Sequence, residues 1–230
     1  MKSKSHIFRK KWGQNFLTDS NLLDRIVRTV EPQENDNILE IGPGDGSLTE
    51  LIFPKVEQMV VVEIDPLLIK HLSIRSDLNG LKIIHGDILN PDTYNNKISE
   101  PFDYIIMRDV IEHVFDQESA MKNIKELLKP EGKLFISFPP KYSPFAGHQQ
   151  NSSRTLSKLP FLHLLPTLLY RLFLMFVMEK KEKIDSFLEI KKTRISINKF
   201  EGILSRTKLK ITLRNLYFIR PCFKYRWGLN

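Results

Sequence analysis

The chain contains a single cysteine, Cys222, among its 230 residues. One cysteine excludes an internal disulfide framework and a zinc site built from several thiolates. The first residues also lack the apolar core of a secretory signal. We therefore expect a protein of the reducing cytoplasm. We expect no metal site either, because no group of His, Cys, Asp and Glu has the spacing of a ligand set.

Long uninterrupted apolar runs are absent as well. The most apolar segment, residues 156–178, is interrupted by charged residues and prolines such as Lys158, Pro160, Pro166 and Arg171. A membrane-spanning helix needs about 20 clean apolar residues, so this segment is not predicted to be a transmembrane span. We expect a helical lid over the substrate side of the core, and interfacial membrane contact is the alternative.

Acidic residues are scarce in the last third of the chain. The net charge is +8, and residues 151–230 hold 17 Lys and Arg against 5 Asp and Glu, whereas residues 1–92 hold 11 against 14. A basic tail suits nucleic acid, anionic lipid headgroups or phosphorylated sugars, and a solvated cationic face has the same composition. Weak RNA binding through the tail is one expectation, and simple solubility is the other.

The apolar residues that are present alternate between strand-like and helix-like patterns. Strands are predicted at 37–41, 58–64, 81–85, 102–107 and 133–138, and helices at 22–30, 47–53, 66–78 and 119–128. Such alternation predicts an α/β fold, a Rossmann-like doubly wound and mostly parallel sheet with helices on both faces. A further helix at 199–206 and a strand at 209–219 follow.

The length and the apolar content of 41% allow one domain with a sizeable core. We expect a single domain made of four consecutive parts. These are a cofactor-binding half (1–92), a catalytic half (93–155), a helical lid or insert (156–198), and a C-terminal helix and strand (199–230).

A glycine-rich turn follows the first predicted strand. Glu40, Gly42, Gly44 and Gly46 form the pattern E-x-G-x-G-x-G, which differs from the G-x-G-x-x-G of a dinucleotide-binding fold. In a doubly wound sheet the ligand lies beyond the carboxyl ends of the strands, and glycines in this turn let the backbone come close to it. The four residues are therefore candidates for cofactor binding.

Acidic residues end the next two predicted strands. Glu63 can accept hydrogen bonds from both ribose hydroxyls of a nucleoside, and Asp87 can meet an adenine amino group. Taken alone, each acid is typical of an exposed strand end. Together with the glycine turn, the two acids surround one nucleoside. The set predicts S-adenosyl-L-methionine as the cofactor, with Ile88 lining the same site, and an NAD site is the main rival.

Three segments resemble the rRNA adenine dimethyltransferases of the small ribosomal subunit. They are K-W-G-Q-N-F-L at 11–17, L-E-I-G-P-G-D-G-S-L-T at 39–49 and V-E-I-D at 62–65. The likeness covers residues 8–92 or so and implies a class I S-adenosylmethionine-dependent methyltransferase. It also implies which residues contact the cofactor: Asn15, Leu17, Gly42, Glu63 and Asp87.

This likeness ends after the fourth predicted strand. The rRNA enzymes carry N-L-P-Y or N-I-P-Y there, and its Asn and aromatic ring hold the flipped adenine, whereas this chain has M-R-D-V-I-E-H at 107–113. Asp109 could accept a hydrogen bond, but no Tyr or Phe occupies the stacking position.

From about residue 100 the chain instead resembles small-molecule and polysaccharide-cluster class I methyltransferases, so the whole is chimera-like. The segments that carry this second likeness are D-V-I-E-H-V at 109–114, L-L-K-P-E-G-K-L at 127–134 and F-P-P-K-Y-S-P-F-A-G-H-Q at 138–149. The second likeness allows a sheet that lacks its last strand.

Methyl transfer requires an aligned nucleophile and, for some acceptors, a base. His113, just after the fourth predicted strand, is the first candidate, and His148, after the fifth, is the second. A backbone-bonding role for His113 and a plain loop role for His148 are the alternatives. Asp109 could orient His113 or line the cofactor site.

The acceptor side of the sequence favours an oxygen or nitrogen nucleophile on a small molecule or glycan. The alternative is rRNA adenine-N6,N6 dimethylation, which the replaced N-L-P-Y motif opposes. A second alternative is a methyltransferase fold that binds the cofactor without catalysis. On the sequence alone, we expect no dimethylation of adenine in small-subunit rRNA.

Overall fold

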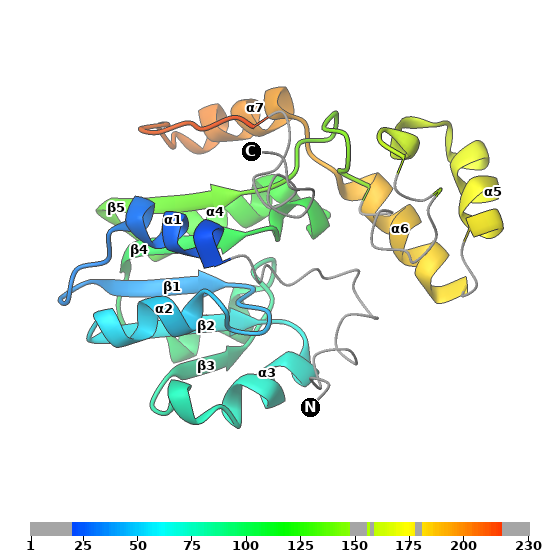
Figure 1. The fold of residues 1–230 in the computed structure, drawn as a ribbon. Coiled ribbons are helices and arrows are strands. Elements are labelled where there is room, and N and C mark those ends of the chain that lie inside the picture. The colour runs from blue at the N-terminus through cyan, green and yellow to red at the C-terminus, as the bar shows by residue number, and fades with distance from the viewer. Residues whose placement is uncertain (1–19, 148–155, 157–158, 178–180, 218–230) are drawn as a thin grey trace. The chain divides into compact units, whose positions relative to one another are not determined.

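A computed structural model describes residues 20–147, 156, 159–177 and 181–217 of the chain. These residues form two compact units (Figure 1). The sheet unit holds residues 20–138 and 203–210, and the helical unit holds the described residues of 139–202 and 211–217. Each unit has its own buried apolar core.

Five parallel strands form the sheet, in the order β3-β2-β1-β4-β5. Their bounds are Asn37–Ile41 for β1, Gln58–Glu63 for β2, Lys82–His85 for β3, Phe102–Arg108 for β4 and Leu128–Ser137 for β5. The chain moves outward from β1 to β3 and then returns to β4 on the other side of β1. The predicted α/β class is confirmed, and the switch point of the sheet lies between β1 and β4.

Helices cover the sheet on both faces. The α-helices of this unit are α1 (Ser20–Val30), α2 (Thr49–Ile52), α3 (Pro66–Ser73) and α4 (Gln117–Leu127). Short 3-10 helices lie at Phe53–Lys55, Ser76–Leu78, Pro91–Thr93, Asn95–Lys97 and Ile111–His113, the last of which is η7. The crossover from β4 to β5 runs opposite to those from β1 to β3. Right-handed crossovers therefore place α4 on the face opposite α2 and α3.

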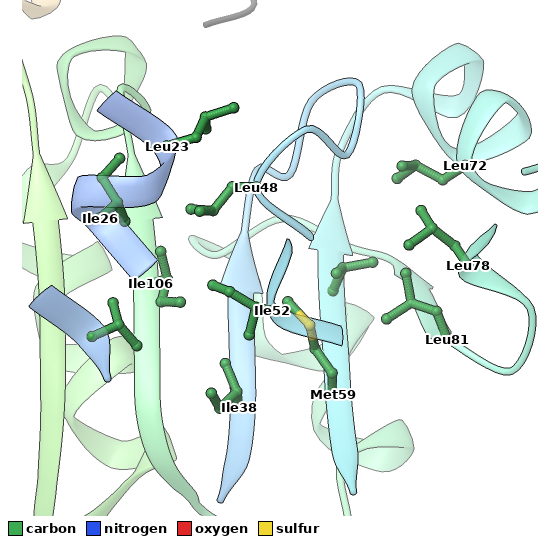
Figure 2. Close-up of a cluster of buried hydrophobic side chains, with 12 residues drawn as sticks. Leu23, Ile26, Ile38, Leu48, Ile52, Met59, Leu72, Leu78, Leu81 and Ile106 are labelled. Atoms are coloured by element: carbon green, nitrogen blue, oxygen red, sulfur yellow. The ribbon is translucent and has the colours of Figure 1, made fainter. Parts of the chain in front are cut away.

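One buried apolar cluster attaches α1 and α2 to the sheet (Figure 2). Ile26 of α1, Ile52 of α2, Ile38 of β1 and Ile106 of β4 belong to it and are almost completely buried. Burying such a side chain contributes about 1.5–3 kcal/mol. Leu48, the last residue before α2, is buried in the same cluster. The cluster therefore holds α2, which follows the turn after β1, against the sheet.

The helix predicted at 66–78 ends at Ser73, and two larger differences from the sequence prediction concern the fifth and the last predicted strands. β5 begins at Leu128 rather than 133, because the Pro-Glu-Gly segment lies inside the strand, where pairing with β4 is irregular. Gly132 fits there because a Cβ would come within 2.8 Å of the Phe102 carbonyl oxygen. The strand predicted at 209–219 is wrong for the described residues 209–217, which join no sheet and leave Leu213 and Leu216 exposed.

The helical unit contains the most apolar segment of the sequence. A 3-10 helix at Leu162–Leu164 precedes α5 (Thr167–Val177) and α6 (Lys181–Thr193), and the residues of α7 (Ile197–Thr207) are divided between the two units. Tyr170 and Leu174 of α5 pack with Phe187 and Ile190 of α6. Among the described residues, no helix is long and apolar enough to cross a membrane.

Candidate cofactor and catalytic site

The turn after β1 is built on glycines that have left-handed backbone conformations. Gly42, Gly44 and Gly46 have φ angles of +68°, +63° and +81°, which favour glycine over residues with a side chain. Gly42 also lies so close to the loop after β4 that a Cβ would come within 2.5 Å of Val110 Cγ2. The turn is therefore packed against β4's loop at the carboxyl edge of the sheet.

Glu63 ends β2, the strand next to β1, and is 3% exposed. Its Oε1 accepts the amide hydrogens of Ile64 and Asp65, each at 2.9 Å, and the nearby Gly44 amide also lowers the pKa of this carboxylate. Burial raises the pKa of Glu63, and these amide bonds oppose the rise. The structure thus brings Glu63 to the glycine turn, as the sequence predicts for a nucleoside site.

Asp87 and Ile88 follow β3 in a tight turn next to β2. The Gly86 amide donates to the Glu63 carbonyl at 3.0 Å, and Asp87 Oδ1 accepts the Leu89 amide at 2.9 Å. Asp87 is half-buried and Ile88 is buried. The third strand end therefore lies directly beside Glu63.

Glu40 is buried within β1 and bonded to the helix that follows the turn. Its Oε2 accepts the Thr49 hydroxyl at 2.6 Å, which joins β1 to α2. Burial raises the pKa of Glu40, and the nearby Arg108 guanidinium opposes this rise. Glu40 therefore stabilises the turn by linking the two elements that flank it, in addition to any contact with a ligand.

The loop after β4 brings Asp109 and His113 together. Asp109 has a φ of +54°, and its amide donates to the Ser137 carbonyl of β5 at 2.8 Å. The His113 amide closes η7 by donating to the Val110 carbonyl at 2.8 Å. Burial lowers the pKa of the His113 imidazole, and the charge of Asp109 opposes the decrease. His113 is consequently neutral near pH 7, the form a general base requires.

Three of the predicted site residues, Asn15, Leu17 and His148, lie outside the described residues. Among the described residues, no three His, Cys, Asp or Glu side chains gather to hold a metal ion. The sequence reasoning overlooked Phe115, which follows η7 and is 70% exposed. The only sequence signal for it is an aromatic residue directly before Asp116, the N-cap of α4.

A parallel sheet in this order, a glycine turn after β1 and an acid at the end of β2 define a class of protein, the class I S-adenosylmethionine-dependent methyltransferases. Solved structures share the fold over most of the chain. The YcgJ protein of Bacillus subtilis has a TM-score of 0.56 at 15% identity, covering 82% of this chain and 68% of that one. The plantazolicin methyltransferase BamL, solved with S-adenosylhomocysteine, has a TM-score of 0.52 at 12% identity, covering 81% and 58%.

The family model described as ribosomal RNA adenine dimethylase matches residues 5–127, and the chain belongs to this family. The Listeria monocytogenes protein called ribosomal RNA small subunit methyltransferase A is 42% identical over 103 residues, which are 44% of this chain and 35% of the relative. The protein of that name from Shewanella piezotolerans is 34% identical over 143 residues, 59% and 53%. The chain thus spans about a third to a half of these relatives.

These comparisons confirm the resemblance seen in the front half and the methyltransferase family that it implies. The matched range continues past residue 92, through β4 and α4. It therefore includes the loop of Asp109 and His113, where the N-L-P-Y motif of the family is replaced.

Proposed function

We propose that the acceptor of this methyltransferase is the exocyclic amino group of an adenine in RNA. The observation that carries the proposal is the family match through residue 127, which includes the acceptor-side loop after β4. The names of the curated relatives, ribosomal RNA small subunit methyltransferase A, support the same acceptor. This ranking reverses the one made from the sequence, where the replaced motif put a small molecule first.

The described residues have separate parts in this proposal. S-adenosyl-L-methionine supplies the methyl group when it is bound. The backbone at Gly42 and Gly44, together with Glu63 and Asp87, would hold its nucleoside, because these groups meet at the carboxyl edge of the sheet.

The loop after β4 would receive the acceptor. Asp109 would accept a hydrogen bond from the amino group, and the neutral His113 would take up its proton. Phe115 offers an exposed aromatic ring on the same loop, on which a flat base could stack. It would take the part of the aromatic residue that the family motif places closer to β4.

A small molecule or glycan with an oxygen or nitrogen nucleophile is the second candidate acceptor. The replacement of N-L-P-Y by M-R-D-V-I-E-H favours it, because Val110 packs on Gly42 and Ile111 and Glu112 are buried. None of these three offers a ring to a flipped base. Substitution of Phe115 therefore distinguishes the two candidate acceptors.

The test is transfer of a labelled methyl group into unmethylated small ribosomal subunits, RNA oligonucleotides and a metabolite and glycan extract. We expect label in RNA adenine. Phe115→Ala should lower this transfer about 5- to 150-fold, the loss of about 1–3 kcal/mol of stacking, without changing cofactor affinity. Ile74→Ala, which truncates an exposed side chain next to α3, is the control.

Label confined to the extract would establish the second candidate and overturn the first. Cofactor binding without label in any pool would overturn both, and would identify a chain that binds the cofactor without catalysis.

A further inference from the structure

The helical unit contains two cations that donate to one carbonyl group. Arg194 is 6% exposed, and its Nη2 donates to the His163 carbonyl oxygen at 3.0 Å. Lys191 Nζ, near the end of α6, donates to the same oxygen at 2.8 Å and also to the Leu165 carbonyl. Because both bond one oxygen, the two charged groups lie side by side.

The charges of these two residues are not balanced by the protein that surrounds them. In the part of the chain that the structure describes, neither Arg194 nor Lys191 forms an ion pair with a carboxylate. Burial lowers the pKa of Arg194 to about 10, and burial and the charge of Lys141 lower the pKa of Lys191. A buried cation without a counter-charge is costly, so this arrangement is incomplete on electrostatic grounds.

Hydrogen-bond donors around the two cations are also unused. Nε and Nη1 of Arg194 are buried and have no partner, and the same is true of the Tyr170 hydroxyl. Lys191 Nζ lies 5.3 Å from the centroid of the Tyr170 ring. His163 is fully buried, and its Nε2 donates to the Lys141 carbonyl at 2.9 Å, which leaves Nδ1 of the neutral ring as an acceptor without a partner. The cluster is therefore rich in donors.

We propose that Arg194, Lys191 and Tyr170 form a binding site for a phosphate group. Phosphate supplies several strong acceptor oxygens and the missing negative charge, and an arginine edge can bind two of its oxygens at once. Tyr142 is 64% exposed and close enough to influence the charge of Arg194, so the cluster lies near the surface of the helical unit at this residue. An RNA backbone and a phosphorylated small molecule carry the same chemistry.

The first test is thermal unfolding of the full chain in inorganic phosphate and in chloride at equal ionic strength. Wild type should gain Tm with phosphate in a saturable way, because a ligand that binds the folded state stabilises it by mass action. R194Q should be at least as stable as wild type in chloride and should gain nothing from phosphate. K192Q is the matched control, since Lys192 is an exposed cation on α6.

Y170F provides an independent variant, because it removes one oxygen from the core and leaves the ring. We expect it to fold and to bind phosphate several-fold more weakly, so it carries the test alone if R194Q does not fold. An equal phosphate response in wild type, R194Q and Y170F would overturn the proposal. Equal destabilisation of R194Q with and without phosphate would also overturn it, since Arg194 would then only cap the His163 carbonyl.

Competition separates the two sources of the group. Ribose 5-phosphate and a short RNA oligonucleotide are titrated separately in chloride, and the one that raises the Tm of wild type, but not of R194Q, at the lower concentration identifies the source. No methyl donor is present in these measurements, so no methyl transfer takes place, and their failure and the failure of the proposed function are distinguishable.

Discussion

Glu63 is a buried carboxylate at the end of β2, the strand next to β1. It is almost fully buried, its Oε1 accepts two backbone amide hydrogens at its own strand end, and burial raises its pKa. Amide donors favour the ionised form of a buried carboxylate, and an ionised carboxylate is well placed to accept hydrogen bonds from a neutral ligand. Glu63, which the sequence predicts as the acceptor of the ribose hydroxyls, is therefore the best-defined residue of the candidate site.

Replacing Glu63 with Ala should weaken binding of S-adenosylhomocysteine by about 1.5–3 kcal/mol, because hydrogen bonds to a charged group are lost. Isothermal titration calorimetry measures this change. Glu57→Ala, which removes an exposed acid next to β2, is the control.

The wild type should lose affinity as the pH falls through the raised pKa of Glu63, above the ordinary value of 4.5. The ionised form binds, so full affinity lies on the alkaline side. Equal dissociation constants for Glu63→Ala and wild type would remove Glu63 from the site.

The turn after β1 and the loop after β4 are coupled through one contact, Gly42 against Val110. β1 and β4 are neighbours in the sheet although more than 60 residues separate them in sequence. Their loops therefore meet at the switch point, where a cofactor and an acceptor must also meet. Changes at this contact are expected to reach both the cofactor turn and the loop of Asp109 and His113.

Gly42→Ala should destabilise the protein by about 1–3 kcal/mol, because the new Cβ lies 2.5 Å from Val110 Cγ2 and φ is positive. Gly80→Ala is a matched control, since Gly80 also has a positive φ but has nothing within 4 Å of the added Cβ. Adding Val110→Ala to Gly42→Ala should restore part of the loss, and urea denaturation measures all four proteins. If Gly42→Ala costs no more than Gly80→Ala, the contact does not constrain the turn.

The family match covers most of the described sheet unit and none of the described helical unit. Residues 5–127 are matched, and they include every strand of the sheet except β5. The described residues of 139–202 lie outside this range and form their own apolar core from α5 and α6. Cofactor binding is thus attributed to the sheet unit with family support, whereas the phosphate site rests on the structure of the helical unit alone.

Deleting residues 1–17 should leave the protein folded, because α1 begins at Ser20 and its buried residues Leu23, Ile26 and Val30 remain. By the resemblance of the Q-N-F-L segment, Asn15 and Leu17 contact the cofactor, so affinity for S-adenosylhomocysteine should fall several-fold. Calorimetry measures the affinity, and circular dichroism checks the fold. A truncated chain that binds as tightly as the full chain would show that this segment takes no part.

The sequence by itself determined the elements that depend on local patterns. It placed β1 at 37–41 with the bounds that the structure has, and it identified the glycine turn and Glu63, because strand periodicity and glycine spacing are local properties. Family membership followed from the same short segments.

Only the tertiary structure decided the features that depend on residues far apart in the chain. Examples are the contact of Gly42 with Val110, the irregular start of β5 and the absence of a strand at 209–217. Alternating apolar residues become a strand only when a neighbouring strand satisfies their backbone groups, and no local pattern reveals that neighbour. The same holds for Arg194, which is buried and donates from Nη2 to the carbonyl of His163, 31 positions earlier in the chain, while Nε and Nη1 have no partner.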